Sequence, residues 1–270
     1  MPKLRVGVVN YLNSKPLAWG FLKGHHSDLF EIAMHPPARI ADLLRDGELD
    51  LGLIPAIELQ RIPHLKVLPD LCIAANHEVR SVLLISRVPA AEIRRVALDE
   101  NSRTSVALVR IILEDGHGLR PEYVTLAADL DAMLAGADAA LLIGDPALRV
   151  DRSKYVVLDL AAEWRAMTGH AFVFALWAAA PSADLPELPF YFKSSLRYGL
   201  SSLESLVREC AAELGLDRGE VREYLTKNLT YFLRADERAG LQEFYRRCAA
   251  KGIIPAAHDI AIWQPSPSAD

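Results

Sequence analysis

Small polar residues follow three of the apolar stretches in this sequence, at the points where those stretches end. They are Asn13 and Ser14 after Leu4–Val9, Ser102, Arg103, Thr104 and Ser105 after Val96–Leu98, and Gly144 and Asp145 after Ala139–Ile143. Where such a turn opens a helix, unpaired backbone N–H groups lie beside hydroxyl and amide donors, and the helix dipole adds partial positive charge. Each residue alone is also an ordinary helix cap, but together the three turns indicate a site for a carboxylate or phosphate.

Two arginines and one serine could complete such a site. Arg80 and Arg103 each carry a planar guanidinium that can bind a carboxylate through two hydrogen bonds, although a solvated arginine or a structural ion pair is an equal alternative. Ser81 begins an apolar stretch, so its hydroxyl faces either the site or water. Glu58 and Asp145 are the carboxylates nearest the expected strand ends. Either could act as a base or orient one, but a surface carboxylate or a cap is the commoner role.

Several common site motifs are absent from the sequence. The turn formed by residues 10–15 contains no glycine, which argues against a dinucleotide site and a P-loop. The histidines form no HExxH motif, and no GxSxG nucleophile elbow occurs. Cys72, Cys210 and Cys248 lie far apart, without the spacing of a metal site or a disulfide framework.

Length and charge narrow the class of protein further. The chain has 270 residues, of which 51% are hydrophobic, and its formal net charge is −5. That is enough apolar material for one large domain or two ordinary ones. The sequence contains no block of basic residues that would bind nucleic acid. It contains no run of about 18 apolar residues that would span a membrane, and no export signal is evident. We expect a cytoplasmic protein that binds neither nucleic acid nor membrane.

Strand and helix patterns alternate through the first part of the chain. Apolar runs at Leu4–Val9, Phe30–Met34 and Leu49–Ile54 predict three strands, and the first run suits a strand buried on both faces. Pro16 and Pro37 suit the first turns of the two helices between them, because proline lacks the N–H that is unpaired there. This alternation predicts a parallel sheet with right-handed crossovers.

A second alternation predicts a second lobe. Its expected strands are Val96–Leu98, Tyr123–Leu126, Ala139–Ile143 and Tyr155–Leu158. Two further strands, Val79–Ser86 and Phe172–Ala179, would cross between the lobes. We therefore expect an α/β fold with a discontinuous first lobe, residues 1–86 plus 172–270 with C-terminal helices, and a second lobe, residues 87–171. Ligands of open α/β sheets bind at the carboxyl ends of strands, so the cleft between the lobes is the expected site.

Seven phrases of the sequence, in this order, resemble the MqnA/MqnD family of the futalosine route to menaquinone, on its chorismate dehydratase branch. Each phrase is weak alone, but the ordered set is specific and spans nearly the whole chain, from Leu4 to Ile254. The phrases are Asn10–Leu17, Gly52–Glu58, Val79–Val82, Ser102–Ser105, Leu142–Leu148, Thr168–Gly169 before Phe172–Phe174, and Tyr224–Tyr231.

The resemblance implies a two-lobed fold like that of type II periplasmic binding proteins, used as an intracellular enzyme. It implies a lyase that dehydrates chorismate, a small dicarboxylate, to 3-[(1-carboxyvinyl)oxy]benzoate, without a metal or an organic cofactor. It matches Asn13 to a functional asparagine and Ser81 to a serine in the cleft. It also implies that the turn 102–105 binds a carboxylate of the substrate. One departure is Lys15, where several relatives are expected to carry an apolar residue.

The expected site therefore has catalytic and binding parts. Asn13 and Ser81 are the expected catalytic residues. Because an amide is too weakly basic to remove a proton, Asn13 should position the substrate or a proton-transfer group. The substrate's own side-chain carboxylate could be the base. The expected substrate-binding residues are Ser14, Arg80, Ser102, Arg103, Thr104, Ser105, Gly144 and Asp145.

Two other functions stay open at this point. A non-catalytic solute-binding protein for a small anionic metabolite would bind without turnover and usually carries an export signal. Relatives of the sister enzyme, 1,4-dihydroxy-6-naphthoate synthase, carry a Pro-Asn-Asp turn and a catalytic histidine, whereas this chain has Tyr11-Leu12-Asn13-Ser14. The sequence leaves the choice between a monomer and a homodimer open.

Overall fold

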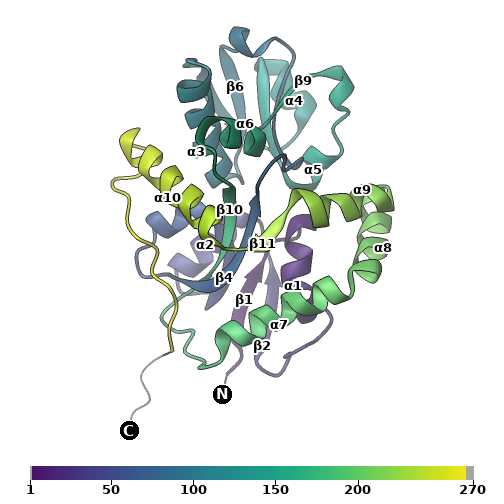
Figure 1. The fold of residues 1–270 in the computed structure, drawn as a ribbon, viewed down its shortest axis with the longest axis vertical. Helices are drawn as coiled ribbons and strands as arrows, with labels where there is room; N and C mark the ends of the chain where they lie inside the picture. Colours follow the sequence, from purple (N-terminus) through teal and green to yellow (C-terminus); the bar gives the residue numbers. More distant parts are fainter. Residues whose placement is uncertain (1, 266–270) are drawn as a thin grey trace.

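Two α/β lobes make up the protein, one above the other in Figure 1. The computed structural model describes residues 2–265. The strands of the first lobe are β1 (Leu4–Val8), β2 (Phe30–Met34), β3 (Leu51–Pro55), β4 (Lys66–Ala75), β10 (Phe172–Ala179) and β11 (Thr230–Phe232). The strands of the second lobe are β5 (Val82–Ser86), β6 (Arg95–Asp99), β7 (Glu122–Leu126), β8 (Ala139–Ile143) and β9 (Val156–Asp159). The predicted α/β fold with two lobes is confirmed.

Helices cover both sheets. They are α1 (Lys15–Leu22), α2 (Pro37–Arg45), α3 (Arg103–Ile111), α4 (Leu130–Gly136), α5 (Gly144–Leu148), α6 (Leu160–Thr168), α7 (Leu188–Ser201), α8 (Leu203–Leu214), α9 (Arg218–Glu223) and α10 (Ala235–Ala250). The helices α1 and α2 begin with proline in the first turn, as predicted. None of the helices in residues 2–265 combines enough length with enough apolar character to span a bilayer.

The first sheet has the order β11-β4-β10-β3-β1-β2. Its strand β1 pairs in parallel with β2 and with β3, which confirms the parallel core predicted from the first three apolar runs. Strand β10 then inserts antiparallel between β3 and β4. Its bounds are those predicted from the sequence, because the run is apolar throughout and seven of its eight residues are buried.

The second sheet corrects one expected boundary. Its order is β7-β6-β8-β5-β9, and β5 pairs antiparallel with both β8 and β9. The expected crossing strand Val79–Ser86 is therefore not one strand. Residues 76–81 pass between the lobes, and Val82–Ser86 belong to the second sheet, ahead of the boundary expected after Ser86. All five residues of β5 are buried, as suits a central strand.

Helix α10 lies across the junction of the lobes, beside α3 and over β10 (Figure 1). The Tyr245 hydroxyl of α10 donates a buried hydrogen bond of 2.6 Å to the Ala56 carbonyl of the first lobe. Its last turn and the residue after it reach the second lobe through ion pairs, Arg247 with Asp115 at 2.9 Å and Lys251 with Glu114 at 2.8 Å. Both lobes are thus fastened to one helix.

Gly240 allows α10 to approach the segment between α6 and β10. A β-carbon at Gly240 would lie 1.9 Å from the Ala171 carbonyl oxygen. Alanine raises helix propensity by about 1 kcal/mol, but the overpacking costs about 1–3 kcal/mol. We expect Gly240→Ala to lower the melting temperature by several degrees, as read by calorimetry.

Gly136 provides the matched control for this substitution. It lies in α4, where an added β-carbon meets no atom within 4 Å. Gly136→Ala should leave the melting temperature unchanged or raise it slightly, because only the unfolded chain loses freedom. Equal melting temperatures for the two variants would mean that the packing at Gly240 is not tight.

Candidate active site

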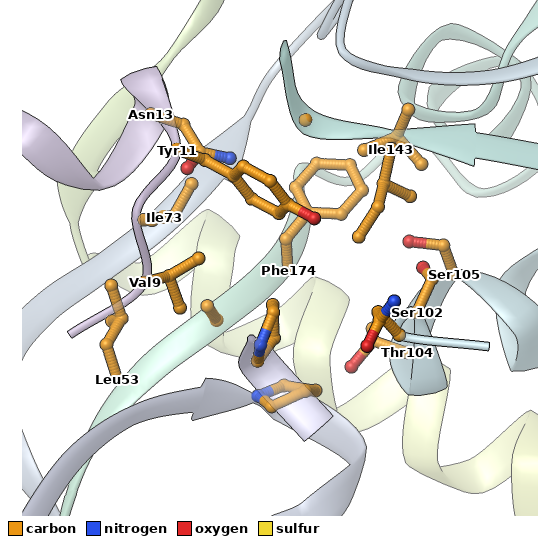
Figure 2. A pocket seen from close by; sticks show the side chains of 16 residues that line it. Val9, Tyr11, Asn13, Leu53, Ile73, Ser102, Thr104, Ser105, Ile143 and Phe174 are labelled. Carbon is orange, nitrogen blue, oxygen red and sulfur yellow. The ribbon is translucent and has the colours of Figure 1, made fainter. Parts of the chain in front are cut away.

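A cavity lies between the lobes, where the carboxyl ends of the parallel strands of both sheets meet (Figure 2). The first lobe contributes Val9, Tyr11, Asn13, Pro37, Leu53, Pro55, Ile73, Phe174 and Ala175. The second lobe contributes Val82, Asn101, Ser102, Thr104, Ser105, Ile143 and Gly144. Its volume is about 60 Å³, room for a few water molecules. The lobes must therefore part to admit a ring-sized molecule.

The walls of this cavity are chemically unlike one another. Figure 2 shows Val9, Leu53 and Ile73 on one side and the hydroxyl-bearing turn at the start of α3 on the other. The Tyr11 ring lies between the two sides, with the Phe174 ring close by. An apolar wall facing a row of hydroxyl groups suits a ring that carries an anionic group at one edge.

The hydroxyl-bearing turn is formed by Ser102, Thr104 and Ser105, all of which are buried. Ser102 occupies the N-cap position of α3, yet its side chain makes no capping hydrogen bond. The first N–H groups of α3 and three hydroxyls thus lie together at the cavity, in the arrangement that binds oxyanions. The Thr104 hydroxyl also accepts a hydrogen bond of 3.2 Å from the Ile57 N–H, which joins the two lobes.

The turn after β1 holds Asn13 at the cavity through Ser14. The Ser14 hydroxyl lies 2.5 Å from the Val9 carbonyl oxygen and 2.8 Å from that of Tyr11. Its proton is used inside the turn and the side chain is absent from the cavity wall. Ser14 therefore shapes the turn in this structure, and its expected contact with the substrate stays a prediction.

Tyr11 was missed by the sequence reasoning, which took the turn from its polar residues alone. Burial, with the nearby Asp99 and Asp145 carboxyls, raises the pKa of Tyr11 to about 12. The phenol therefore stays protonated at neutral pH and can donate a hydrogen bond into the cavity. Its ring packs against Gly144, where a β-carbon would lie 2.9 Å from the ring and the backbone φ is 65°. Glycine is required there for the lobes to approach this closely.

Arg103 does not point its guanidinium into the cavity. It binds Asp42 of α2 at 2.8 Å and Glu58 at 3.1 Å, both in the first lobe. Glu58 is fully buried and also binds Arg45 at 3.1 Å and Arg61 at 2.8 Å. The alternative of a structural ion pair thus describes Arg103, because first-lobe carboxylates already occupy its donors. The Arg103 hydrogen bond also holds the pKa of Asp42 below its usual range, although burial opposes it.

Arg80 also lies outside the cavity wall. Its backbone φ is 61°, and its N–H donates to the Asp159 carboxylate at 2.7 Å. Its side chain borders a separate small hollow with Leu12 and Tyr224. The expected role of Arg80 as a carboxylate clamp is not seen in this closed form, because the left-handed turn directs the residue away from the cavity.

Asp145 joins the lobes and does not line the cavity. Its Oδ1 accepts a hydrogen bond of 2.9 Å from the Leu12 N–H of the first lobe. Burial raises the pKa of Asp145, and the Leu12 hydrogen bond opposes that shift. Together with the contacts of Arg103 and Thr104, this bond makes the structure a closed form of the two lobes.

Ser81 lies just behind the cavity wall. Its side chain is fully buried, and its hydroxyl accepts a hydrogen bond of 2.7 Å from Tyr224. Its carbonyl accepts a hydrogen bond of 2.8 Å from the N–H of Gly144, which is a wall residue. The structure thus brings together Asn13, Ser102, Thr104, Ser105 and Gly144 at the cavity, with Ser81 directly beneath.

The carboxyl group of Asp99 is another feature that the sequence did not reveal. It ends β6, one turn before the hydroxyl-bearing turn, and its Oδ2 is buried without a partner in the described part of the chain. Burial raises the pKa of Asp99.

No group of three or more His, Cys, Asp or Glu side chains within residues 2–265 is arranged to hold a metal ion.

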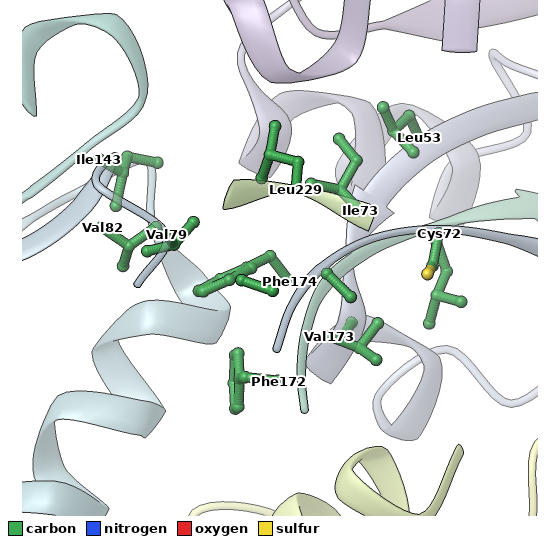
Figure 3. Packing of buried hydrophobic residues seen from close by; sticks show 14 of the residues in the cluster. Leu53, Cys72, Ile73, Val79, Val82, Ile143, Phe172, Val173, Phe174 and Leu229 are labelled. Atoms are coloured by element: carbon green, nitrogen blue, oxygen red, sulfur yellow. The ribbon is translucent and has the colours of Figure 1, made fainter. Parts of the chain in front are cut away.

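Phe174 links the cavity to the core. Figure 3 shows its ring between the Val82 and Ile143 side of the second lobe and the Ile73 and Leu229 side of the first. Apolar packing thus continues from one lobe to the other beneath the site. This packing explains why Phe174 belongs both to the core and to the cavity wall.

Residues 4–250 match a protein family described as menaquinone biosynthesis. The chain is 30% identical to the chorismate dehydratase of Thermus thermophilus, over 88% of this chain and 93% of the relative. It is 26% identical to the chorismate dehydratase of Campylobacter jejuni, over 92% and 98% of the two chains.

Solved structures support the fold alone. A protein of Archaeoglobus fulgidus matches with a TM-score of 0.77 at 17% identity, over 93% of this chain and 98% of that one. The periplasmic aliphatic sulphonate binding protein of Escherichia coli matches with a TM-score of 0.68 at 19% identity, over 100% and 95%. The predicted fold like that of periplasmic binding proteins is therefore confirmed.

Proposed function

The chain belongs to the menaquinone biosynthesis family, and we propose that it is a hydro-lyase that dehydrates chorismate to 3-[(1-carboxyvinyl)oxy]benzoate. The observation that carries this proposal is the cavity itself, with apolar side chains facing three hydroxyls and a helix N-terminus. Both curated relatives named above are chorismate dehydratases that align over most of the chain. Neither the solute-binding alternative nor the sister enzyme is favoured.

The reaction removes one proton and one hydroxide from the ring of chorismate. The C3–H bond breaks, its electron pair moves into the ring, the C4–O bond breaks, and the expelled hydroxide takes up a proton to leave as water. The ring becomes aromatic, which supplies the driving force. Negative charge develops on the ring carboxylate as C3 loses its proton, so the protein must stabilise an enolate-like anion.

The hydroxyl-bearing turn is suited to hold that carboxylate. Ser102, Thr104 and Ser105 provide O–H donors, and α3 directs its first N–H groups and the positive end of its dipole to the same place. These donors are fixed before the reaction starts, so they need no reorganisation as charge develops.

Asn13 and Tyr11 lie on the opposite lobe and face the same cavity. The amide of Asn13 cannot act as a base at neutral pH, so its role is to fix the position of the ring substituents. Tyr11 stays a neutral phenol and can donate a hydrogen bond to the departing hydroxyl. The side-chain carboxylate of chorismate is the base that this arrangement leaves for the C3 proton.

Incubation of the purified protein with chorismate tests the function. We expect time-dependent loss of chorismate and formation of the aromatic enolpyruvyl ether, separated by chromatography and identified by mass. A solute-binding protein would bind chorismate without consuming it. Binding without turnover, at protein concentrations where calorimetry detects the complex, would refute the proposal.

A further inference from the structure

Tyr224 makes the hydrogen bond that holds Ser81 beneath the cavity. It is the first residue of a π-helical turn, Tyr224–Asn228, that follows α9. Its hydroxyl donates to the Ser81 hydroxyl at 2.7 Å, and both side chains are buried. A hydroxyl–hydroxyl bond of this length inside a dry interior fixes the orientation of both groups.

The Ser81 hydroxyl accepts this bond, and the backbone of Ser81 connects the pair to the cavity wall. Ser81 is bonded through its carbonyl to Gly144 and is followed by Val82, and both of these residues line the cavity.

Burial raises the pKa of the Tyr224 phenol, and the hydrogen bond with Ser81 opposes that shift. The phenol therefore stays protonated at neutral pH. Tyr224 and Ser81 lie 143 residues apart in the sequence, so this bond is made only by the folded chain.

From this geometry we propose that Tyr224 is a positioning residue, whose hydroxyl fixes Ser81 and, through the backbone of Ser81, the cavity wall at Val82 and Gly144. The proposal rests on the function proposed above. Tyr224 itself does not line the cavity, so it acts through Ser81. Loss of its hydroxyl should slow the chemical step and leave substrate capture by the hydroxyl-bearing turn intact.

Tyr231 supplies a matched control. Its side chain is buried in the same hydrophobic cluster as Tyr224, but its hydroxyl has no hydrogen-bond partner in the described chain. Tyr231→Phe therefore removes the same atom from the same region without breaking a bond. Removal of an unpartnered buried hydroxyl is neutral or stabilising.

The test compares Tyr224→Phe with Tyr231→Phe in steady-state dehydration of chorismate. We expect Tyr224→Phe to lower kcat by about 10–100-fold, the cost of misplaced catalytic groups, with KM within about twofold of wild type. Tyr231→Phe should keep both constants within about twofold. Melting curves of each protein set an assay temperature at which all are folded, so that kcat reports on the site.

A double variant separates positioning from a general structural role. In a Ser81→Ala background, Tyr224→Phe should lower kcat by less than about threefold, because the hydroxyl through which Tyr224 acts is already gone. Full additivity of the two substitutions, or a wild-type kcat for Tyr224→Phe, overturns the inference. Failure of the wild-type protein to convert chorismate would instead overturn the proposed function.

Discussion

Replacement of Asn13 by alanine should lower kcat for chorismate dehydration by about 10²–10³-fold, the usual effect of losing one fixed hydrogen-bonding group next to developing charge. Asn13 faces the cavity from the turn after β1. The truncation therefore removes an amide that can bind the substrate and leaves the rest of the cavity wall in place. The turn itself should persist, because Ser14 closes it through the Val9 and Tyr11 carbonyls.

Asn10 is the control for this prediction. It lies in the same turn, is exposed, and accepts a hydrogen bond of 2.9 Å from Lys15 at the surface. Asn10→Ala should retain kcat within about twofold, and both variants should melt within a few degrees of wild type, about 2–4 °C per kcal/mol of lost stability. A wild-type kcat for Asn13→Ala would exclude this residue from the catalytic machinery.

Replacement of Arg103 by methionine should raise KM by about 10–100-fold, because hydrogen bonds between charged groups contribute about 1.5–3 kcal/mol. Arg103 joins the second lobe to Asp42 and Glu58 of the first. Without it the closed form is less populated, and substrate binding must supply the missing free energy. The value of kcat at saturation should change little, since Arg103 does not line the cavity.

Arg61→Met is the matched control, because Arg61 binds the same Glu58 carboxylate at 2.8 Å from within the first lobe. It should leave KM within about threefold of wild type. Small-angle scattering should show product-induced compaction in wild type and Arg61→Met, and less of it in Arg103→Met. Equal KM values for the two variants would mean that the Arg103 contacts do not control closure.

The pH dependence of closure follows from the same contact. The pKa of Asp42 is lowered from its ordinary value of 3.8, with the Arg103 hydrogen bond as the largest cause. The ion pair is therefore complete above that ordinary value and is lost as the pH falls through the lowered one. Across neutral pH the contact between the lobes stays intact.

Local patterns predicted the fold well. The apolar run that became β10 is continuous, so its burial on both faces could be inferred without knowledge of its neighbours. The start of α1, with Pro16 in its first turn, follows from the geometry of proline. The boundary after Ser86 was wrong because an apolar run does not reveal which of two sheets it joins.

The site was predicted only where the residues act through their own turn. Ser102, Thr104 and Ser105 reach the cavity because they begin a helix after a strand, which is a local property. Arg103, in the same turn, binds partners that lie 45 and 61 residues away, which no local pattern could show. No local pattern could have revealed that Tyr224 bonds Ser81 from 143 residues away.

The contacts of α10 with both lobes limit how far the lobes of the enzyme can move apart. A helix of 16 residues is a rod about 24 Å long that does not stretch. Tyr245 ties it to one lobe, and Arg247 and the adjoining Lys251 tie it to the other. While these contacts hold, substrate must enter and product must leave by a small hinge rotation of the lobes. A larger opening requires that the Tyr245 hydrogen bond or the two ion pairs break first. Helix α10 thus acts as a mechanical stop on the opening step of the catalytic cycle.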